Sequence, residues 1–429
     1  MKNTKKVSEL SRENTVRFMP PPVSWFQQPA GFVPARGSVT YPEGFLSSGI
    51  SAGLKKKGLP DVALLVSEKS AVAAGCFTTN AVKAAPVVVC RRHLANPIHA
   101  VLMNAKCANS YTGKEGIEDA LGLLSDLASF FGLHRKNFMV ASTGVIGERL
   151  PVAKIRSSLS GLVMHLSHQD TQAARAIMTT DTVEKTAACR MKISGREVRI
   201  GAMAKGAGMI APRMATMLAF ATTDAVIRRP LLQKALDEAV GLSFNRITVD
   251  GDTSTNDTIL CLANGTAGNR EITAGSPGYR IFLRALTWVC QQLAWKVVSD
   301  GEGVTKVFEV VVEGAASRQD AVKAGRAVAC SPLVKTAVFG EDLNWGRIVN
   351  AAGYSGAAFD PSRLDLWIGD VNLLRKGRLA RDRLAAADRI IRKPFFSVRI
   401  GLNNGKETDR VLTTDFSYDY VRINADYRS

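Results

Sequence analysis

The sequence has 429 residues, of which 46% are hydrophobic and 22% are charged, as is usual for a globular enzyme with a sizeable buried core. Its 56 lysines and arginines outnumber its 38 acidic residues, which gives a formal net charge of +18. A basic surface attracts anions in general, but the sequence has neither a zinc-finger spacing nor an RNA-binding aromatic motif, so no nucleic-acid partner is expected.

The N-terminal segment and the cysteine and histidine usage bear on compartment and metal binding. The seven cysteines include no C-x-x-C pair, which favours reduced thiols in a reducing compartment. His165 and His168 lie one helical turn apart without a third ligand nearby, so we expect no metal. Residues 1–30 are basic and contain a run of three prolines, and we interpret them as a flexible extension. The expected compartment is the cytoplasm, with the mitochondrial matrix as the alternative if the extension is a transit peptide.

Short apolar runs separated by turn residues follow the extension, and their lengths predict strands. These runs are DVALLV (61–66), AVAAGCF (71–77), APVVVC (85–90) and IHAVLM (98–103). Residues 116–132 then carry apolar side chains at helical spacing, with acidic residues in the first turn, which predicts a helix. A second helical pattern covers residues 151–167 and begins with a proline, at a position where helices tolerate one.

The second half of the chain continues the mixture of helices and strands. Helices are predicted over 230–242, 279–300 and 319–329. The one over 279–300 is too polar to span a bilayer and is interpreted as a buried helix, so no membrane partner is expected. Two apolar runs, 394–402 and 409–416, flank an Asn-Asn-Gly sequence, which predicts a hairpin with an Asn-Gly turn.

Together these elements predict an α/β fold with antiparallel (α+β) features, built from layers of sheet and helix. A glycine-rich GEG stretch at 301–303 ends one set of elements, and a fresh strand–helix alternation follows it. We therefore place a boundary near Lys306, which separates residues 31–305 from residues 306–429.

Three loops carry polar residues that suit catalysis. KGAGMIAPRMATMLAF (205–220) leads into an apolar strand, and Thr216 at this junction is by itself typical of a strand start. STGVIGERLP (142–151) is a turn of small residues before a helix, which can place a hydroxyl and a backbone N–H at the helix start as an oxyanion site. MTTDTVEK (178–185) surrounds Asp181 with threonines, and a helix cap is its simplest structural explanation.

Nucleotide and calcium sites find little support in the motifs. The sequence has no P-loop and no strand–GxGxxG–helix arrangement, so we expect no cofactor of this kind. ITVDGDTSTNDT (247–258) is similar to a calcium loop at first sight, but it departs from the EF-hand template at Thr255 and Cys261.

A set of long motifs links the chain to a known family. The motifs occur in one order over about residues 31–429: FTTNAVKAAPV, STGVIG, TTDT, KGAGMIAPRMATML, ITVDGDTSTNDT, GEGVTK, SPLVKTAVFGEDLNWGRI and DYVRINADYRS. With them the chain resembles the glutamate N-acetyltransferase / ornithine acetyltransferase family of arginine biosynthesis. The resemblance implies a layered nucleophile domain over 31–305 and a smaller C-terminal α/β domain over 306–429.

The resemblance also implies a self-cleaving precursor. The bond that corresponds to the family's cleavage site is Ala215–Thr216, so cleavage would give an α chain, 1–215, and a β chain that begins at Thr216. The freed α-amino group has a reference pKa of about 7.7–8.0, so a useful fraction is neutral and can act as general base for the Thr216 hydroxyl. This is the threonine variant of N-terminal nucleophile catalysis, which needs no histidine. Acetyl would pass from N2-acetyl-L-ornithine to Thr216 and then to L-glutamate.

Further site residues are implied by position within the family motifs. Thr143 and Gly144 match the oxyanion-hole pair. The positions that bind the amino-acid substrate are Thr182, Lys205, Thr216, Glu302, Asn424 and Ser429. Lys205 suits the substrate carboxylate, Asn424 and Ser429 suit the carboxylate and amide, and Glu302 suits the ornithine ammonium. The implied assembly is a heterotetramer of two α and two β chains.

Departures from the family pattern leave alternatives open. Lys106 stands in a glycine-rich place within NAKCANSYTG (104–113), and Ala207 and Arg213 replace the usual serine and asparagine. These changes leave room for a paralogous acyltransferase with altered substrate preference, and a hydrolase on the same scaffold is a second alternative. A basic, non-enzymatic binding protein is the third alternative. The residues do not decide whether acetyl-CoA also serves as acetyl donor.

Overall fold

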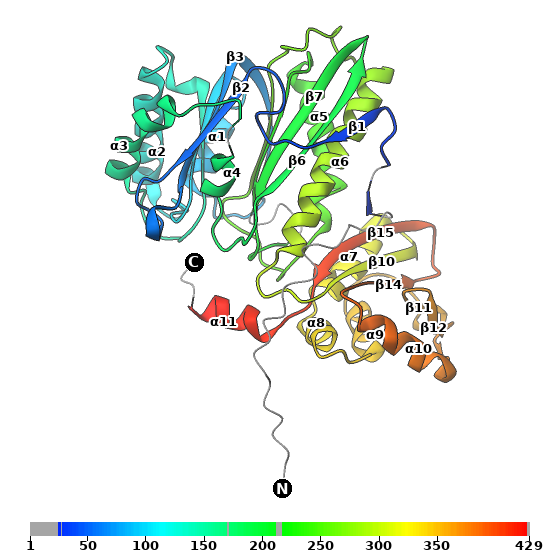
Figure 1. Ribbon diagram of the computed structural model, residues 1–429. Coiled ribbons are helices and arrows are strands. Elements are labelled where there is room, and N and C mark those ends of the chain that lie inside the picture. Colours follow the sequence, from blue (N-terminus) through cyan, green and yellow to red (C-terminus); the bar gives the residue numbers. More distant parts are fainter. Residues whose placement is uncertain (1–24, 27, 170, 212–216, 427–429) are drawn as a thin grey trace.

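The computed structural model describes residues 25–26, 28–169, 171–211 and 217–426. Two sheets and the helices packed on them account for most of this part of the chain, in a larger unit and a smaller one that lies beside it (Figure 1). The predicted mixture of sheets and helices is confirmed. No helix within the described ranges is long and apolar enough to cross a membrane.

The larger sheet runs in the order β1-β6-β7-β8-β9-β3-β4-β5, with β2 paired to β3. Parallel pairs are β4 with β5 and β8 with β9, and the other pairs are antiparallel. Its strands are β1 Phe32–Ala35, β2 Phe45–Ile50, β3 Val62–Phe77, β4 Ile98–Asn104, β5 Phe138–Ser142, β6 Lys185–Ile193, β7 Arg196–Lys205, β8 Leu218–Thr223 and β9 Thr258–Ala263.

Strand β3 joins the two halves of this sheet. Its first part, from Val62 to Val66, pairs with β2 and β4, whereas its second part, from Val72 to Phe77, pairs with β9. The register shifts between Val66 and Ala71, and such an irregularity bends a strand. The two runs expected as separate strands, 61–66 and 71–77, are therefore one continuous strand.

Helices cover both outer faces, so the larger unit has four layers (Figure 1). Helices α5 and α6 pack against strands that include β3, β6 and β7, and their apolar residues form one core with them. Helices α2 and α3 share a second core with β4 and β5, and a third core lies between the two halves of the sheet. The helices are α1 Ala85–His93, α2 Gly113–Ser129, α3 Val152–Met164, α4 Gln172–Ala176, α5 Arg229–Gly241 and α6 Pro277–Ser299.

The smaller sheet runs in the order β13-β12-β11-β14-β10-β15 and buries one apolar core against its helices. Its strands are β10 Val307–Ala315, β11 Asp365–Ile368, β12 Val371–Arg375, β13 Arg378–Leu379, β14 Phe395–Gly401 and β15 Glu407–Thr414. The helices of this part are α7 Arg318–Ala329, α8 Pro332–Phe339, α9 Trp345–Gly353 and α10 Leu384–Ile391. The C-terminal helix α11, Tyr418–Asp426, follows β15 and contributes nothing to this core.

Helical periodicity located five helices correctly: α2, α3, α5, α6 and α7. The strand predicted at 85–90 was wrong, because these residues form α1. A short run of buried apolar residues fits either element, and Pro86 in the first turn supplies the fixed φ that starts a helix.

The predicted C-terminal hairpin was also wrong. Strands β14 and β15 are not neighbours, because β10 lies between them, parallel to β14 and antiparallel to β15. The Asn-Asn-Gly connection crosses the end of β10, where Leu402 and Asn404 donate backbone hydrogen bonds to Glu313 and Gly314. The Asn-Gly sequence favours a tight turn, but a turn does not decide whether the strands on either side of it pair with each other or with a third strand between them.

Candidate active site

A cavity collects residues from distant parts of the larger unit and from α11. Five of the residues predicted for the site lie in its wall: Thr143, Gly144, Lys205, Glu302 and Asn424. The wall is completed by Ala108, Ile146, Thr179, Thr180, Gly208, Met209, Ser254 and Asn256. Ala215, Thr216 and Ser429 lie outside the described residues.

Thr143 and Gly144 directly follow β5. Gly144 has φ of +134°, and a Cβ there would lie 2.1 Å from the carbonyl carbon of Lys106, so no side chain fits. The Lys205 ammonium donates to Thr143 Oγ1 at 3.3 Å. An ammonium can only donate, so the Thr143 hydroxyl keeps its own proton for a second partner. The expected placement at a helix start was wrong, because α3 begins only at Val152.

The loop after β4 packs directly on this turn. Its residues Lys106, Asn109 and Tyr111 have φ of 71°, 49° and 58°, in the left-handed region that glycine adopts most easily. Asn256 ties this loop to β5, since its Nδ2 donates to the carbonyls of Ala108 at 2.6 Å and Ser142 at 2.8 Å. Asn256 was not predicted as a site residue, although it lies in the conspicuous segment 247–258.

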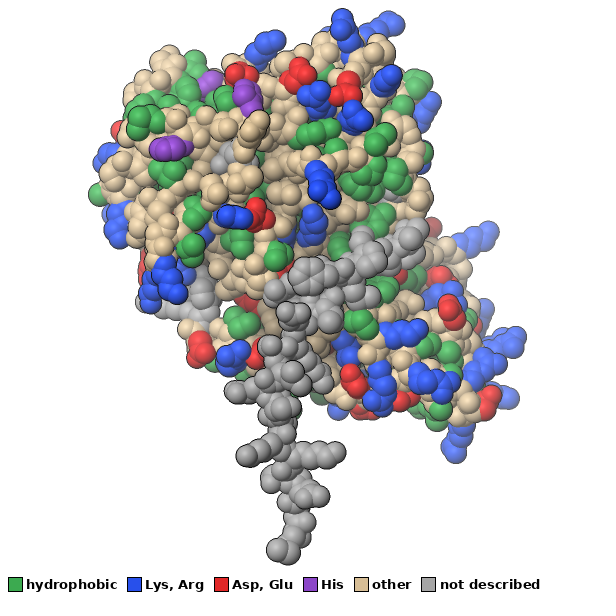
Figure 2. All heavy atoms as spheres, in the orientation of Figure 1, with side chains coloured by type: hydrophobic (Ala, Val, Ile, Leu, Met, Phe, Trp, Pro, Cys, Tyr) green, Lys and Arg blue, Asp and Glu red, His purple; other side chains and the backbone are tan. Residues whose placement is uncertain are grey.

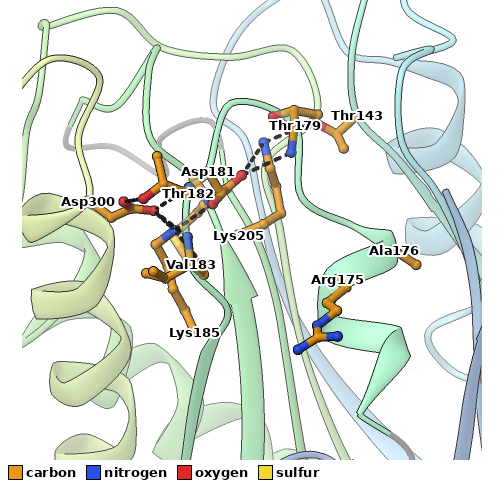
Figure 3. A network of polar contacts seen from close by, with 12 residues as sticks. Thr143, Arg175, Ala176, Thr179, Asp181, Thr182, Val183, Lys185, Lys205 and Asp300 are labelled. Carbon is orange, nitrogen blue, oxygen red and sulfur yellow. Dashed lines mark hydrogen bonds and ion pairs between the residues drawn. The ribbon is translucent and has the colours of Figure 1, made fainter. Parts of the chain in front are cut away.

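Lys205 is the last residue of β7, and its side chain is almost fully buried. Burial lowers the pKa of this lysine, and the carboxylate of Asp181 opposes that effect. The Nζ of Lys205 lies 4.0 Å from Asp181 Oδ2. The close view shows the two side chains pointing toward one another (Figure 3). The cavity therefore has a cation in its wall whose nearest carboxylate is not in close contact.

The segment 178–185 is not a helix cap. Helix α4 ends at Ala176 and the next element is the strand β6, so Asp181 caps no helix. Its carboxylate instead accepts from the ammonium of Lys185 at 2.6 Å and from the N–H of Gly206 at 2.6 Å. Thr182, predicted to bind substrate, is not in the cavity wall, and both its N–H and its hydroxyl donate to Asp300.

Glu302 brings a carboxylate to the same cavity. Its N–H donates to Ala207 O at 3.0 Å, and its side chain lies over Gly208, where a Cβ would come within 2.3 Å of Oε2. Asn424 of α11 donates from Nδ2 to Glu302 Oε2 at 2.8 Å. Among the described residues of its wall, the cavity thus presents one cation, Lys205, and one carboxylate, Glu302.

Half-buried Asp250 and buried Asp257, neither of them predicted as a site residue, hold the chain on either side of residues 212–216. Asp250 Oδ1 accepts from the N–H of Ile210 at 2.7 Å, and burial raises the pKa of Asp250 to about 6. Asp257 Oδ1 accepts from the N–H of Met217 at 3.0 Å, and burial raises its pKa well above the usual range. Both lie in the segment 247–258, whose acidic residues were considered only for calcium. The described residues contain no group of three or more His, Cys, Asp or Glu that could hold a metal.

Comparison with known proteins supplies the family. The model of the ArgJ family matches residues 46–429. The arginine biosynthesis bifunctional protein ArgJ of Symbiobacterium thermophilum is 49% identical over 397 residues, which are 92% of this chain and 99% of that protein.

Two solved structures are also similar. The crystal structure of an arginine biosynthesis bifunctional protein ArgJ from Bacillus halodurans shares 40% sequence identity with a TM-score of 0.46, and it covers 48% of this chain and 97% of that one. An ornithine acetyltransferase from Mycobacterium tuberculosis, solved in complex with ornithine, shares 35% identity with a TM-score of 0.39 and covers 42% of this chain and 98% of that one.

The family match and the curated relative confirm the family predicted from the motifs, and with it the prediction of an acyltransferase of arginine biosynthesis. The chain belongs to the ArgJ family.

Proposed function

We propose that this protein transfers acetyl from N2-acetyl-L-ornithine to L-glutamate through an acyl ester on Thr216. The observation that carries the proposal is the meeting of Thr143, Gly144, Lys205, Glu302 and Asn424 in one cavity, although they come from distant parts of the chain. Lys205 suits a substrate carboxylate, and Glu302 suits the side-chain ammonium of ornithine. Met209, near the proposed cleavage site in sequence, lies in the wall of the same cavity.

The nucleophile forms by self-cleavage. The Thr216 hydroxyl attacks the carbonyl carbon of Ala215, and the hydroxyl of Thr143 and the N–H of Gly144 stabilise the oxyanion. The peptide C–N bond then breaks as its nitrogen takes a proton, which leaves an ester between Ala215 and the Thr216 oxygen. Water hydrolyses this ester, and the chains 1–215 and 216–429 result, the second with a free α-amino group.

Acetyl transfer reuses these groups. The neutral α-amine of Thr216 removes the hydroxyl proton, and Oγ attacks the acetyl carbon of N-acetylornithine. The leaving amine of ornithine takes the proton, ornithine departs, and the acetyl ester remains on Thr216. The amine of glutamate attacks this ester and leaves as N-acetylglutamate. No cofactor is needed for these steps, and acetyl-CoA is a second acetyl donor to be tested in the same assay.

Intact mass under denaturing conditions is the first test. The expected result is two chains, 1–215 and 216–429, and N-terminal sequencing of the second should read TMLAF. Thr216→Ala should leave one uncut chain without activity, whereas Thr216→Ser keeps a hydroxyl and should still cleave. A single uncut chain in the wild-type protein, in fresh and aged samples alike, would overturn the proposal.

A hydrolase on the same scaffold is the alternative, in which water takes the acetyl group. Lys205 and Glu302 are both in the cavity wall and favour an amino-acid acceptor over water. The assay separates the two by product: N-acetylglutamate supports transfer, and free acetate that forms at the same rate with and without glutamate supports hydrolysis.

Organisation and location are proposed from the resemblance. We expect two α and two β chains in the assembly, a nucleophile domain over 31–305 and a C-terminal domain over 306–429, all in the cytoplasm. Lysines and arginines lie scattered over both units on the face shown in Figure 2, with acidic side chains between them, rather than in one stripe. This distribution disfavours the hypothesis that the chain is a basic protein that binds nucleic acid.

A further inference from the structure

Two lysines and two aspartates form a buried network beside the cavity (Figure 3). Lys185 Nζ donates to Asp181 Oδ1 at 2.6 Å and to Asp300 Oδ2 at 2.7 Å, and none of these three side chains is more than 1% exposed. Lys205 is the fourth member, and Asp181 lies between the two lysines. Of the four, only Lys205 lies in the cavity wall.

Asp181 is shared unequally between the two lysines. Its Oδ1 accepts from Lys185 and from the N–H of Gly206, both at 2.6 Å, and its Oδ2 accepts from the N–H of Thr179 at 3.0 Å. Lys205 lies 4.0 Å from Oδ2 and makes its closer contact with Thr143. The carboxylate is therefore held mainly by groups other than the lysine in the cavity wall.

The charges around Lys205 decide whether its amine stays protonated. Burial disfavours the ammonium, and so does the neighbouring Lys185, whereas Asp181, Glu302 and Asp257 favour it. Lys55, whose Nζ donates to the carbonyls of Pro60 and Ala176, adds a further cation nearby. Among the carboxylates, Asp181 has the largest influence on Lys205.

Lys185 in turn keeps Asp181 ionised. Burial would raise the pKa of the Asp181 carboxyl, but Lys185, Lys205 and the N–H of Gly206 outweigh it and lower this pKa. Without Lys185, the ammonium of Lys205 would be the nearest cation to Asp181, with Lys55 acting from farther away. A close pair between the two would occupy the cation that the substrate carboxylate needs.

We propose that Asp181 is a positioning residue that keeps the Lys205 ammonium at the cavity wall, and that Lys185 prevents Asp181 from capturing it. This inference rests on the proposed function, because the anion that Lys205 binds is the carboxylate of the N-acetyl amino acid. Neither Asp181 nor Lys185 touches the substrate, and both act through Lys205.

The test is the pH dependence of KM and kcat for N-acetylornithine with glutamate as acceptor, in cleaved wild type, Asp181→Asn and Lys185→Met. In Asp181→Asn, Lys205 loses its main carboxylate, so KM should begin to rise at a pH about one unit lower than in the wild type. At the acid end, where Lys205 is still charged, KM should match the wild type.

Lys185→Met should shift the pH dependence of KM in the opposite direction. Asp181 then pairs closely with Lys205, so KM should rise about tenfold already at pH 7, and its further rise should move to higher pH. The double variant Asp181→Asn/Lys185→Met removes one charge of each sign and serves if a single variant does not fold, because it leaves one lysine, Lys205, and one aspartate, Asp300, and so keeps the net charge of the network unchanged. It should behave as Asp181→Asn does.

Asp409→Asn is the matched control. Asp409 is also a buried aspartate in an ion pair, with its Oδ1 3.2 Å from Arg246 Nη2, but it is not part of the cavity wall. The substitution should leave both profiles unchanged. A merely structural role would lower kcat equally at every pH without moving the KM profile, and this result in the variants would overturn the inference. If the wild type transfers no acetyl at all, the proposed function fails; if it does and the profiles do not move, only the inference fails.

Discussion

Asn424 in the C-terminal helix α11 donates a hydrogen bond to Glu302 at 2.8 Å, although 122 positions separate the two residues in the sequence. Helix α11 buries none of its residues, so this bond, together with contacts near Ser417, holds it against the larger unit. The pair brings the last described part of the chain to the cavity that contains Lys205. The position of the Glu302 carboxylate and the position of α11 are therefore coupled.

Glu302→Gln should weaken the binding of N-acetylornithine while the position of α11 is preserved. Glutamine keeps an oxygen that can accept from Asn424, but it removes the charge that the substrate ammonium needs. Loss of one charged hydrogen bond corresponds to a rise in KM of about 10- to 100-fold. Steady-state kinetics provide the check, with Asn424→Ala as the variant that keeps the charge and should raise KM less. An unchanged KM in Glu302→Gln would remove Glu302 from the substrate site.

Thr143→Val should lower the rate constants of both self-cleavage and transfer. The substitution keeps the shape of the side chain and removes the hydroxyl proton that stabilises the oxyanion, which is expected to reduce kcat about 100- to 1000-fold. Time courses of intact mass measure cleavage, and product formation measures transfer. Thr143→Ser retains the hydroxyl and should stay within about tenfold of the wild type. Wild-type rates in Thr143→Val would show that another group holds the oxyanion.

Gly144→Ala should abolish both activities. Its Cβ would meet backbone atoms of Lys106 at 2.1 and 2.4 Å, and neither backbone can give way without moving the loop and the oxyanion-hole turn. Gly147→Ala is the matched control, because Gly147 also has a positive φ, +87°, but an added Cβ meets nothing within 4 Å. Gly147→Ala should lower the free energy of unfolding by about 1 kcal/mol through backbone strain and retain activity. Equal activity in the two variants would contradict this account.

Asn256→Ala should destabilise the fold around the cavity. It leaves two buried carbonyls, those of Ala108 and Ser142, without their donor, which is expected to reduce the free energy of unfolding by about 2 to 4 kcal/mol. Asn404 also donates a hydrogen bond from Nδ2, to the carbonyl of Ala358 at 2.9 Å, but it is exposed, so Asn404→Ala should cost less than about 1 kcal/mol. Denaturant unfolding measures both, and similar losses would refute the role of burial.

Asp250 should make stability depend on pH in the acid range. Burial raises its pKa from 3.8 to about 6, so between these values the folded state binds more protons than the unfolded state. The stabilising contribution of the protonated group is therefore complete below about pH 4 and is lost as the pH rises through 6.

Asp250→Asn should make this fall in stability shallower by the contribution of one group, because Asp257, whose pKa burial also raises, keeps its own contribution. The asparagine cannot accept both loop N–H groups, so baseline stability will fall. The exposed neighbour Asp252 provides the control substitution, Asp252→Asn, which should leave the slope as in the wild type. Melting temperature measured from pH 4 to 7 is the readout. A slope as steep in Asp250→Asn as in the wild type would assign the titration to other groups.

Helices whose apolar residues recur at helical spacing along the sequence were predictable. The helical spacing over 116–132 and 279–300 defines which face is apolar, and this pattern survives in any fold that buries that face. α2 and α6 were therefore located correctly to within a few residues. The run at 85–90 lacked such a pattern, because all its residues are apolar or small, and its helical form became clear only from its packing.

The order and identity of the motifs determined the family and pointed to five residues that line one cavity, because those residues lie within long, unusual stretches of sequence. Only the tertiary structure placed β10 between β14 and β15, and only it brought Asp181, Lys185, Lys205 and Asp300 into one buried network. The physical reason is that strand pairing and the pairing of buried charges are contacts over long sequence separations. Their energies depend on distance in space and on burial, and neither quantity is written in the local pattern of residues.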